Sequence, residues 1–129
     1  MDAMPTVLVL DDDPAVRKTL VRLLLAYGYA GVPAETLDEA RIVLGTNTVQ
    51  ALILDVGLEP GKSGLDLLTA IRSRKELAAA PILIFTGQGL SDEEKGVIRR
   101  HGAFLFHKPE GFDALIQFLD TLTGRDQSH

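Results

Sequence analysis

Cysteine is absent from this chain of 129 residues, which excludes disulfide bonds, thiolate metal sites and cysteine nucleophiles. A basic excess is absent too, because 13 Lys and Arg stand against 18 Asp and Glu and leave a net charge of -5. A nucleic-acid backbone is therefore not the expected partner, since proteins that bind one gather positive charge on one face. No apolar run approaches the roughly 20 residues that a membrane helix needs. We expect a soluble, cytoplasmic protein without membrane contact.

The composition that is present fits one ordinary globular domain. Hydrophobic residues make up 46% and charged residues 24% of the chain, which is the usual balance for a folded domain. A chain of this length has room for a single core. We expect one domain over residues 1–123 and a polar, flexible tail over residues 124–129.

Short apolar runs alternate with helical patterns from one end of the chain to the other. Buried strands are predicted at residues 7–10, 29–32, 51–54, 82–85 and 103–106, the second being the weakest. Because these runs are apolar at consecutive positions, the strands should be buried on both faces, as in a parallel sheet covered by helices. Right-handed crossovers then give an α/β fold with a doubly wound, five-stranded parallel sheet and five helices.

Several helix ends carry sequence signatures. Asp13 with Pro14 predicts an N-cap and a first-turn proline. Thr36 and Ser91 are each followed three residues later by a glutamate, which predicts two capping boxes. Glycines are expected to end three of the helices, at positions 45, 102 and 124.

Polar residues follow four of the five predicted strands. The run Asp11–Asp13 follows the first strand, Asp55 the third, Thr86 the fourth and Lys108 the fifth. In an open parallel sheet these strand ends lie on one edge, where ligands bind. Taken singly, each residue also fits a helix cap or an exposed turn. Their joint occurrence at four strand ends favours one shared site.

The chemistry of that site follows from its charges. Neighbouring carboxylates repel each other by about 4 kcal/mol at roughly 4 Å with an effective dielectric near 20. Mg²⁺ prefers such oxygen ligands and keeps positions for phosphate oxygens. Lys108 adds a positive charge and Thr86 a hydroxyl donor. A cation, an ammonium and a hydroxyl around the carboxylate of Asp55 suit phosphoryl transfer through an aspartyl-phosphate.

Four motifs occur in order along residues 5–123: VLVLDDDP at 7–14, LILD at 52–55, ILIFTG at 82–87 and FHKP at 106–109. Together they resemble the receiver domain of two-component response regulators, of the type that acts in chemotaxis. The resemblance implies a flavodoxin-like sheet with the strand order 2-1-3-4-5. It covers nearly the whole chain.

The resemblance also implies roles for individual residues. Asp55 would be the phosphoryl acceptor and, with Asp12, a direct ligand of Mg²⁺ or Mn²⁺. Asp11 would reach the metal through water, and the backbone carbonyl of Gly57 would complete the metal site. Lys108 would pair with the acceptor and then with its phosphoryl group.

The same resemblance makes Thr86 the switch hydroxyl and suggests a cis peptide bond before Pro109. Two features depart from the family pattern. The spacing from Asp55 to the following proline and glycine is one residue longer than usual, and Leu105 stands where the family commonly has Tyr or Phe. The second departure indicates that the signal is passed outward in a different way.

The resemblance implies a phosphoryl donor that is a histidine kinase or a histidine phosphotransfer protein, and chemistry limited to the chain's own phosphorylation and dephosphorylation. We expect a stand-alone regulator that signals to a protein target rather than to nucleic acid, with a homodimer left open. Two alternatives stand beside this reading. One is a pseudo-receiver that acts only as a binding module. The other is a small phosphohydrolase of the haloacid-dehalogenase type, because Asp11 and Asp13 imitate its Asp-x-Asp signature.

Overall fold

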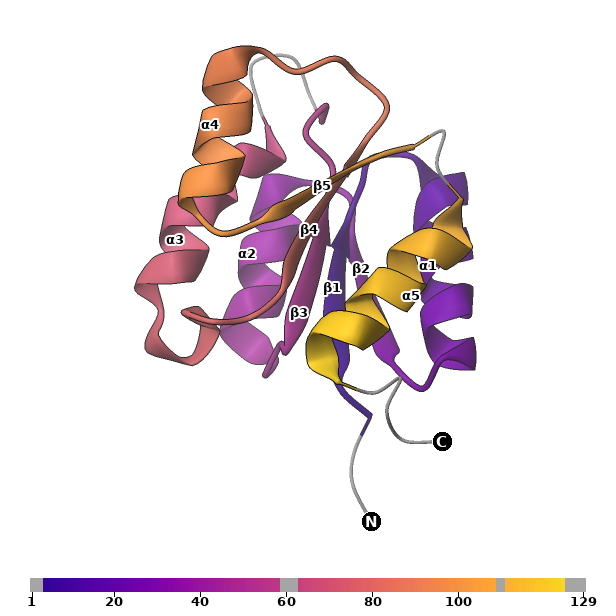
Figure 1. Cartoon of the computed structure of the whole chain (residues 1–129). Coiled ribbons are helices and arrows are strands. Elements are labelled where there is room, and N and C mark those ends of the chain that lie inside the picture. Colours follow the sequence, from indigo (N-terminus) through magenta and orange to yellow (C-terminus); the bar gives the residue numbers. More distant parts are fainter. Residues whose placement is uncertain (1–3, 59–62, 109–110, 125–129) are drawn as a thin grey trace.

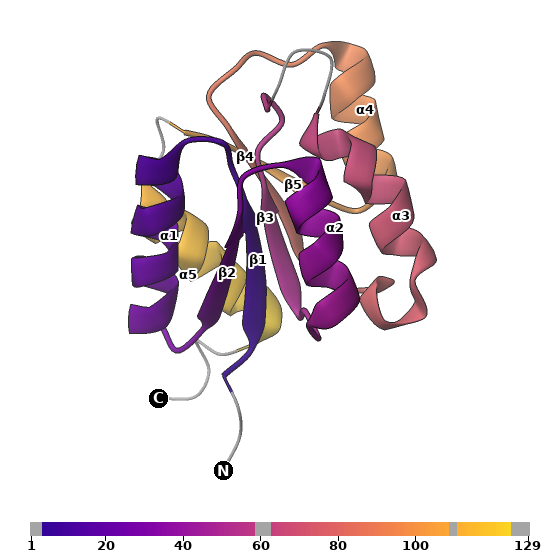
Figure 2. The same ribbon diagram turned by 180° about the vertical axis from the view of Figure 1, so that it is seen from behind.

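The computed structural model describes residues 4–58, 63–108 and 111–124, and it shows three layers. A parallel sheet lies in the middle, with helices on both of its faces (Figures 1 and 2). The strand order is β2-β1-β3-β4-β5, and each neighbouring pair is parallel. The predicted fold class and strand order are confirmed. The strands are β1 (Thr6–Leu10), β2 (Ala30–Ala34), β3 (Ala51–Leu54), β4 (Ile82–Thr86) and β5 (Phe104–His107).

The helices alternate with these strands along the chain. Helices α1 and α5 cover one face of the sheet, and α2, α3 and α4 cover the other (Figure 1). Two short 3-10 helices flank α3. The helical elements are α1 (Pro14–Ala26), α2 (Leu37–Thr46), η1 (Gly64–Leu67), α3 (Leu68–Ser73), η2 (Lys75–Leu77), α4 (Asp92–Arg100) and α5 (Phe112–Thr123). The predicted tail beyond residue 124 lies outside the described residues.

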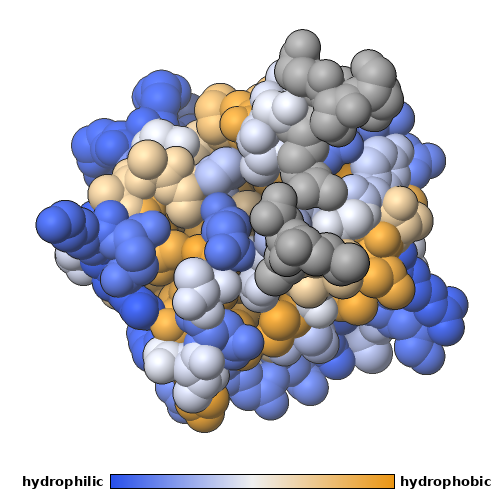
Figure 3. All heavy atoms as spheres, turned by 90° about the horizontal axis from the view of Figure 1, so that it is seen from below, coloured by the Kyte–Doolittle hydropathy of each residue, from blue (hydrophilic) through white to orange (hydrophobic). Residues whose placement is uncertain are grey.

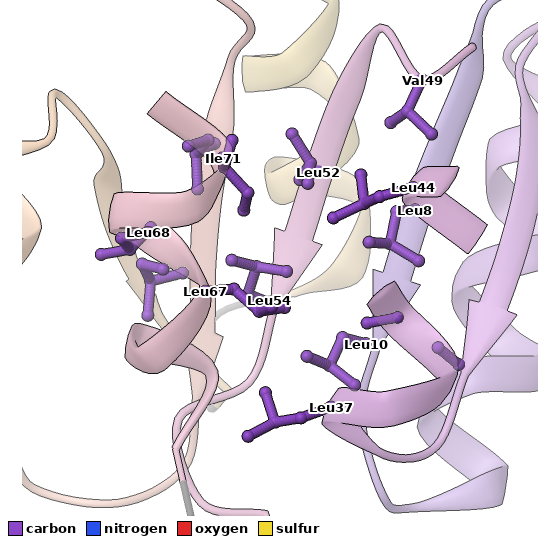
Figure 4. Packing of buried hydrophobic residues seen from close by; sticks show 14 of the residues in the cluster. Leu8, Leu10, Leu37, Leu44, Val49, Leu52, Leu54, Leu67, Leu68 and Ile71 are labelled. Atoms are coloured by element: carbon purple, nitrogen blue, oxygen red, sulfur yellow. The ribbon is translucent and has the colours of Figure 1, made fainter. Parts of the chain in front are cut away.

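The strands are apolar at consecutive positions because both faces of the sheet are covered. Side chains alternate between the faces of a strand, so Leu8 and Leu10 point toward α2 while Val7 and Val9 point toward α1 and α5. Figure 4 shows the first of these two cores, in which leucines of β1 and β3 meet leucines of α2 and α3. Fully burying such a side chain contributes roughly 1.5–3 kcal/mol. The inner strands β1, β3 and β4 are therefore apolar at every buried position except Thr86, the last residue of β4.

The predicted helix starts are found, with one difference. Asp13 caps α1, its Oδ1 accepting a hydrogen bond from the amide of Ala15 at 2.9 Å. Ser91 and Glu94 form both halves of a capping box. Thr36 forms only half of one, because the carboxylate of Glu39 accepts from the amide of Glu35 instead.

Several expected boundaries are shifted. Strand β1 starts one residue earlier than predicted, and β5 starts and ends one residue later. Helix α2 runs one residue past Gly45 to Thr46, since nothing lies near that glycine and a helix can pass through it. Strand β2 starts one residue later than predicted and ends at Ala34 instead of Val32. It includes Pro33 because β2 is an edge strand, where a missing N–H costs no ladder hydrogen bond.

Arg72 links α3 to the end of α4 by hydrogen bonds. Its Nε donates a hydrogen bond to the carbonyl of His101 at 2.7 Å, and its Nη1 donates to the carbonyl of Ala80 at 2.7 Å. Burial lowers the pKa of Arg72. Because His101 caps the end of α4 and Ala80 precedes β4, one side chain holds three segments together.

Figure 3 shows the end of the molecule where the strands begin. Hydrophilic side chains dominate the outline of this face, and apolar ones appear among them in small groups (Figure 3). Among the described residues, none of the helices has the length and apolar character needed to cross a membrane.

Candidate functional site

The carboxyl ends of the strands meet at one edge of the sheet, at the top of Figure 1. Backbone hydrogen bonds hold the first residues beyond the strands in register. The amide of Asp55 donates to the carbonyl of Leu10 at 2.8 Å, and the amide of Lys108 donates to the carbonyl of Thr86 at 2.8 Å. Asp55 is thereby held beside the end of β1, and Lys108 beside the end of β4.

Three carboxylates cluster at this edge. Asp11, Asp12 and Asp55 each offer an oxygen atom, and these atoms lie within 4.8 Å of one another. Asp11 and Asp55 are buried, with exposed fractions of 2% and 4%, whereas Asp12 is exposed. Asp13 takes a different part, because its side chain caps α1 and its amide donates to Asp11 Oδ1 at 2.9 Å.

Lys108 bridges the two buried carboxylates. Its Nζ lies 2.9 Å from Asp11 Oδ2 and 3.1 Å from Asp55 Oδ2. Burial lowers the pKa of Lys108, but the hydrogen bonds and negative charges of the two aspartates outweigh it, so that its pKa is raised overall. Burial raises the pKa of Asp11, against the lowering effect of its hydrogen bonds from Lys108 and Asp13. The ammonium is therefore held in its charged form between two carboxylates.

The donor set fits a hard divalent cation. The cluster holds three aspartate side chains but only one lysine among the described residues. Each aspartate offers a carboxylate oxygen to a cation, and one of the three, Asp12, is exposed to solvent. Mg²⁺ is commonly held by one or two carboxylates and keeps further positions for water and phosphate oxygens. The residues present meet that description.

The loop after β3 returns to Asp55 in spite of its extra residue. Gly57 and Ser63 form an isolated antiparallel bridge that closes the loop at its base. Gly64 follows, and a Cβ at this position would overlap the backbone carbonyl oxygen of Asp55. A glycine is therefore required beside Asp55. Pro60, where the spacing departs from the family, lies outside the described residues, as does Pro109 with its expected cis bond.

Thr86 and Leu105 occupy the two expected switch positions. Thr86 is fully buried, and its Oγ1 accepts a hydrogen bond from the amide of Gln88 at 3.3 Å. Leu105 packs against the core on the α2 and α3 face. Phe104 and Phe106 flank it but contact Phe118 of α5, with ring centroids 5.1 Å apart in both pairs. Leu105, which was expected to lie at the switch, is itself aliphatic.

The sequence interpretation missed two residues that lie against this site. Arg17 donates from Nη1 to the backbone carbonyl of Asp11 at 2.8 Å. Gln88 places its side-chain oxygen where a Cβ of Gly57 would be. Arg17 follows the cap residue Asp13 by one helical turn, and this spacing could have indicated that its side chain lies near the start of α1 and the aspartates. Gln88 lies in an irregular segment, where periodicity predicts nothing.

A family model described as the response regulator receiver domain matches residues 7–120. The chain belongs to this family. The resemblance seen in the sequence is thereby confirmed, and the protein is a receiver domain of two-component signal transduction. Membership implies a phosphoacceptor role and, in general, a histidine kinase as partner. Receiver domains are signalling modules rather than classical enzymes, which argues against the phosphohydrolase alternative.

Solved structures agree with this assignment. The response regulator receiver protein of Pseudomonas putida is 31% identical with a TM-score of 0.81, covering 94% of this chain and 99% of that one. The response regulator TrrA of Thermotoga maritima, solved in complex with Mg²⁺ and BeF, is 30% identical with a TM-score of 0.76. The match covers 92% of this receiver domain and 99% of TrrA.

The curated relatives are longer proteins. The gliding motility regulatory protein of Myxococcus xanthus is 29% identical over 91% of this chain, which corresponds to 15% of that protein. The response regulator protein FleR of Pseudomonas aeruginosa is 32% identical over 88% of this chain and 23% of its own length. The chain spans less than half of the length of the curated relatives that it matches.

Proposed function

We propose that Asp55 accepts a phosphoryl group from a histidine kinase or a histidine phosphotransfer protein, and that the phosphorylated domain signals through a changed surface to a protein partner. One observation carries the proposal. The carboxylate of Asp55 is buried, is held by the ammonium of Lys108 at 3.1 Å, and lies in a cluster with two further aspartates. The complex of TrrA with Mg²⁺ and BeF supports the same chemistry in a related domain.

Asp12, Asp55 and the backbone carbonyl of Gly57 would hold Mg²⁺ or Mn²⁺ directly, and Asp11 through water. The ion, when bound, supplies positive charge that neutralises the oxygens of the transferring phosphoryl group. The Asp12 carboxylate is exposed and gives the site an open side.

In the transfer, an oxygen of Asp55 attacks the phosphorus of the donor phosphohistidine. The P–N bond breaks as the P–O bond forms, and the leaving imidazole keeps the electron pair of the broken bond. Lys108 already contacts both Asp11 and Asp55, so it can stay with Asp11 while turning its charge to the phosphoryl oxygens. The positive charge is thus in place before the reaction.

Thr86 would then report the phosphorylated state. Its hydroxyl is buried at the end of β4 and accepts a long hydrogen bond from the amide of Gln88, which a phosphoryl oxygen can replace. Because Leu105 has no aromatic ring that could move with Thr86, the conformational change on phosphorylation should pass through the segment between β4 and α4. Amide shifts in the beryllofluoride-bound domain should therefore reach residues 87–91 and α4. Shifts confined to the metal loop would contradict this coupling.

Incubation with Mg²⁺ and acetyl phosphate tests the acceptor. We expect a mass increase of one phosphoryl group that survives acid and is lost in base. Asp55→Asn should abolish the adduct. Asp13→Asn is the matched control, because asparagine caps a helix as well as aspartate does, and it should keep the adduct. An adduct retained in Asp55→Asn would remove Asp55 from its role.

Metal binding distinguishes the phosphoacceptor from the pseudo-receiver alternative. A titration with Mg²⁺ to millimolar concentrations should shift the amides of Asp12, Asp55 and Gly57. Unchanged amides together with no adduct would favour a module that only binds. A phosphotransfer profile against purified histidine kinases would then identify the donor.

A further inference from the structure

A shallow groove of about 430 Å³ lies between α1 and the edge strand β2, and it shares no residue with the aspartate cluster. Its lining is mostly apolar. Side chains of Pro14 and Val21 come from α1, and Pro33 from β2. Helix α1 sits close to the strand here, because a Cβ at Gly31 would lie only 3.3 Å from the Cα of Val21. Pro33 follows on the same side of the strand and offers no N–H group.

The rim of this groove is positive. Arg17, Lys18 and Arg22 line it, and α1 contains no acidic residue although the chain has a net charge of -5. Arg17 is already engaged by the carbonyl of Asp11 and lies 3.7 Å from the carboxylate of Glu35. Lys18 and Arg22 are exposed, and within the described part of the chain neither is in an ion pair. Their charges are available to a partner.

The apolar lining continues along α1. Leu25 follows Val21 by one turn on the same side of the helix, and 59% of it is exposed. Lys18 and Arg22 are spaced by the same single turn and lie next to this apolar pair. An apolar stripe accompanied by a row of cations is complementary to an amphipathic helix that carries apolar anchors one turn apart and acidic residues beside them.

We propose that this groove docks an acidic, amphipathic helix of a protein partner. A nucleic-acid backbone fits less well, because three cations without an aromatic residue make a small footprint on an acidic protein. A second copy of the domain could offer the acidic start of α4. Such a contact joins two different surfaces, and repeated head to tail it builds rings or open chains. Docking here does not require Asp55 to be phosphorylated, so the two proposals fail separately.

The test uses a synthetic helical peptide with two leucines one turn apart and glutamates on both flanks. Its addition to the full chain should shift amides of α1 and β2 and leave α4 unchanged. Lys18→Glu/Arg22→Glu should weaken binding about tenfold. Lys95→Glu/Arg99→Glu makes the same charge change on exposed residues of α4 and should leave binding unchanged. Leu25→Ser should also weaken it, which shows that charge alone does not suffice.

Five results would overturn the proposal. The peptide could fail to bind, or a control peptide with lysines in place of the glutamates could bind as well. Binding could be equal in both charge-reversal variants. Vesicles of anionic lipid or duplex DNA could bind to α1 where the peptide does not, which would assign the surface to another class of partner. Finally, a concentration-dependent mass that disappears in Lys18→Glu/Arg22→Glu, without peptide binding, would assign the groove to a second copy.

Discussion

Lys108→Met should destabilise the metal-free domain. With Nζ–O distances of 2.9 and 3.1 Å, each attraction is about 5 kcal/mol at an effective dielectric near 20. The variant loses both attractions and leaves the carboxylates of Asp11 and Asp55 within 4.8 Å of each other, where they repel by about 3–4 kcal/mol. Part of this is offset because the ammonium no longer has to be desolvated. Removing one partner from a buried pair costs about 3–5 kcal/mol in practice, which we expect here.

Urea denaturation in EDTA measures this loss, and its pH dependence identifies the cause. Burial already raises the pKa of Asp11, and removing the Lys108 hydrogen bond raises it further. The folded variant then binds more protons than the unfolded chain, so its stability falls as the pH rises through the folded-state pKa. The deficit should therefore be smaller at about pH 5 than at about pH 8.

Two variants make the prediction sharp. Lys108→Met/Asp55→Asn also removes the carboxylate of Asp55, so that it no longer repels Asp11, and the double variant should recover most of the lost stability. Lys95→Met, on the exposed face of α4, should unfold at the same urea concentration as the unchanged protein. Equal midpoints for Lys108→Met and the unchanged protein at about pH 8 would refute the view that Lys108 holds the two carboxylates together.

Three further predictions follow from other contacts. Gly64→Ala should lower the free energy of unfolding by about 2 kcal/mol or more and reduce phosphorylation, because the added Cβ overlaps a backbone oxygen of Asp55. The control Gly57→Ala meets only the end of the flexible Gln88 side chain and should lower it by under about 1 kcal/mol. Arg72→Lys keeps the charge but loses the fork that joins α3 and α4, so urea midpoints should report a loss of about 2–3 kcal/mol. Asp13→Ala should cost about 1 kcal/mol without changing the yield of the acetyl phosphate adduct.

Much of the architecture follows from local sequence. Strands β1, β3 and β4 are apolar at consecutive positions along most of their length, and this pattern is typical of strands covered on both faces. The helix starts at Asp13 and Ser91 follow from side-chain capping, which depends on residues two or three positions apart. The weak strand β2 was harder to delimit, because Pro33 is tolerated only through its position at the edge of the sheet.

The site could be predicted in part. Residues that directly follow parallel strands must share one edge, so the nearness of Asp11, Asp12 and Asp55 could be expected from their positions. The sequence does not show which of these carboxylates the long side chain of Lys108 contacts. Only the packed structure shows that it bridges two of them.

The sequence by itself therefore determined the order of the elements, the parallel sheet and the residue types at the strand ends, because these depend on periodicity and capping between near neighbours. The tertiary structure alone decided that Lys108 bridges Asp11 and Asp55, how Arg72 joins α3 to α4, and that α1 and β2 enclose a groove with a positive rim. Those features depend on distances between segments far apart in the chain. Such distances are set by how the helices pack on the sheet, and no local pattern records them.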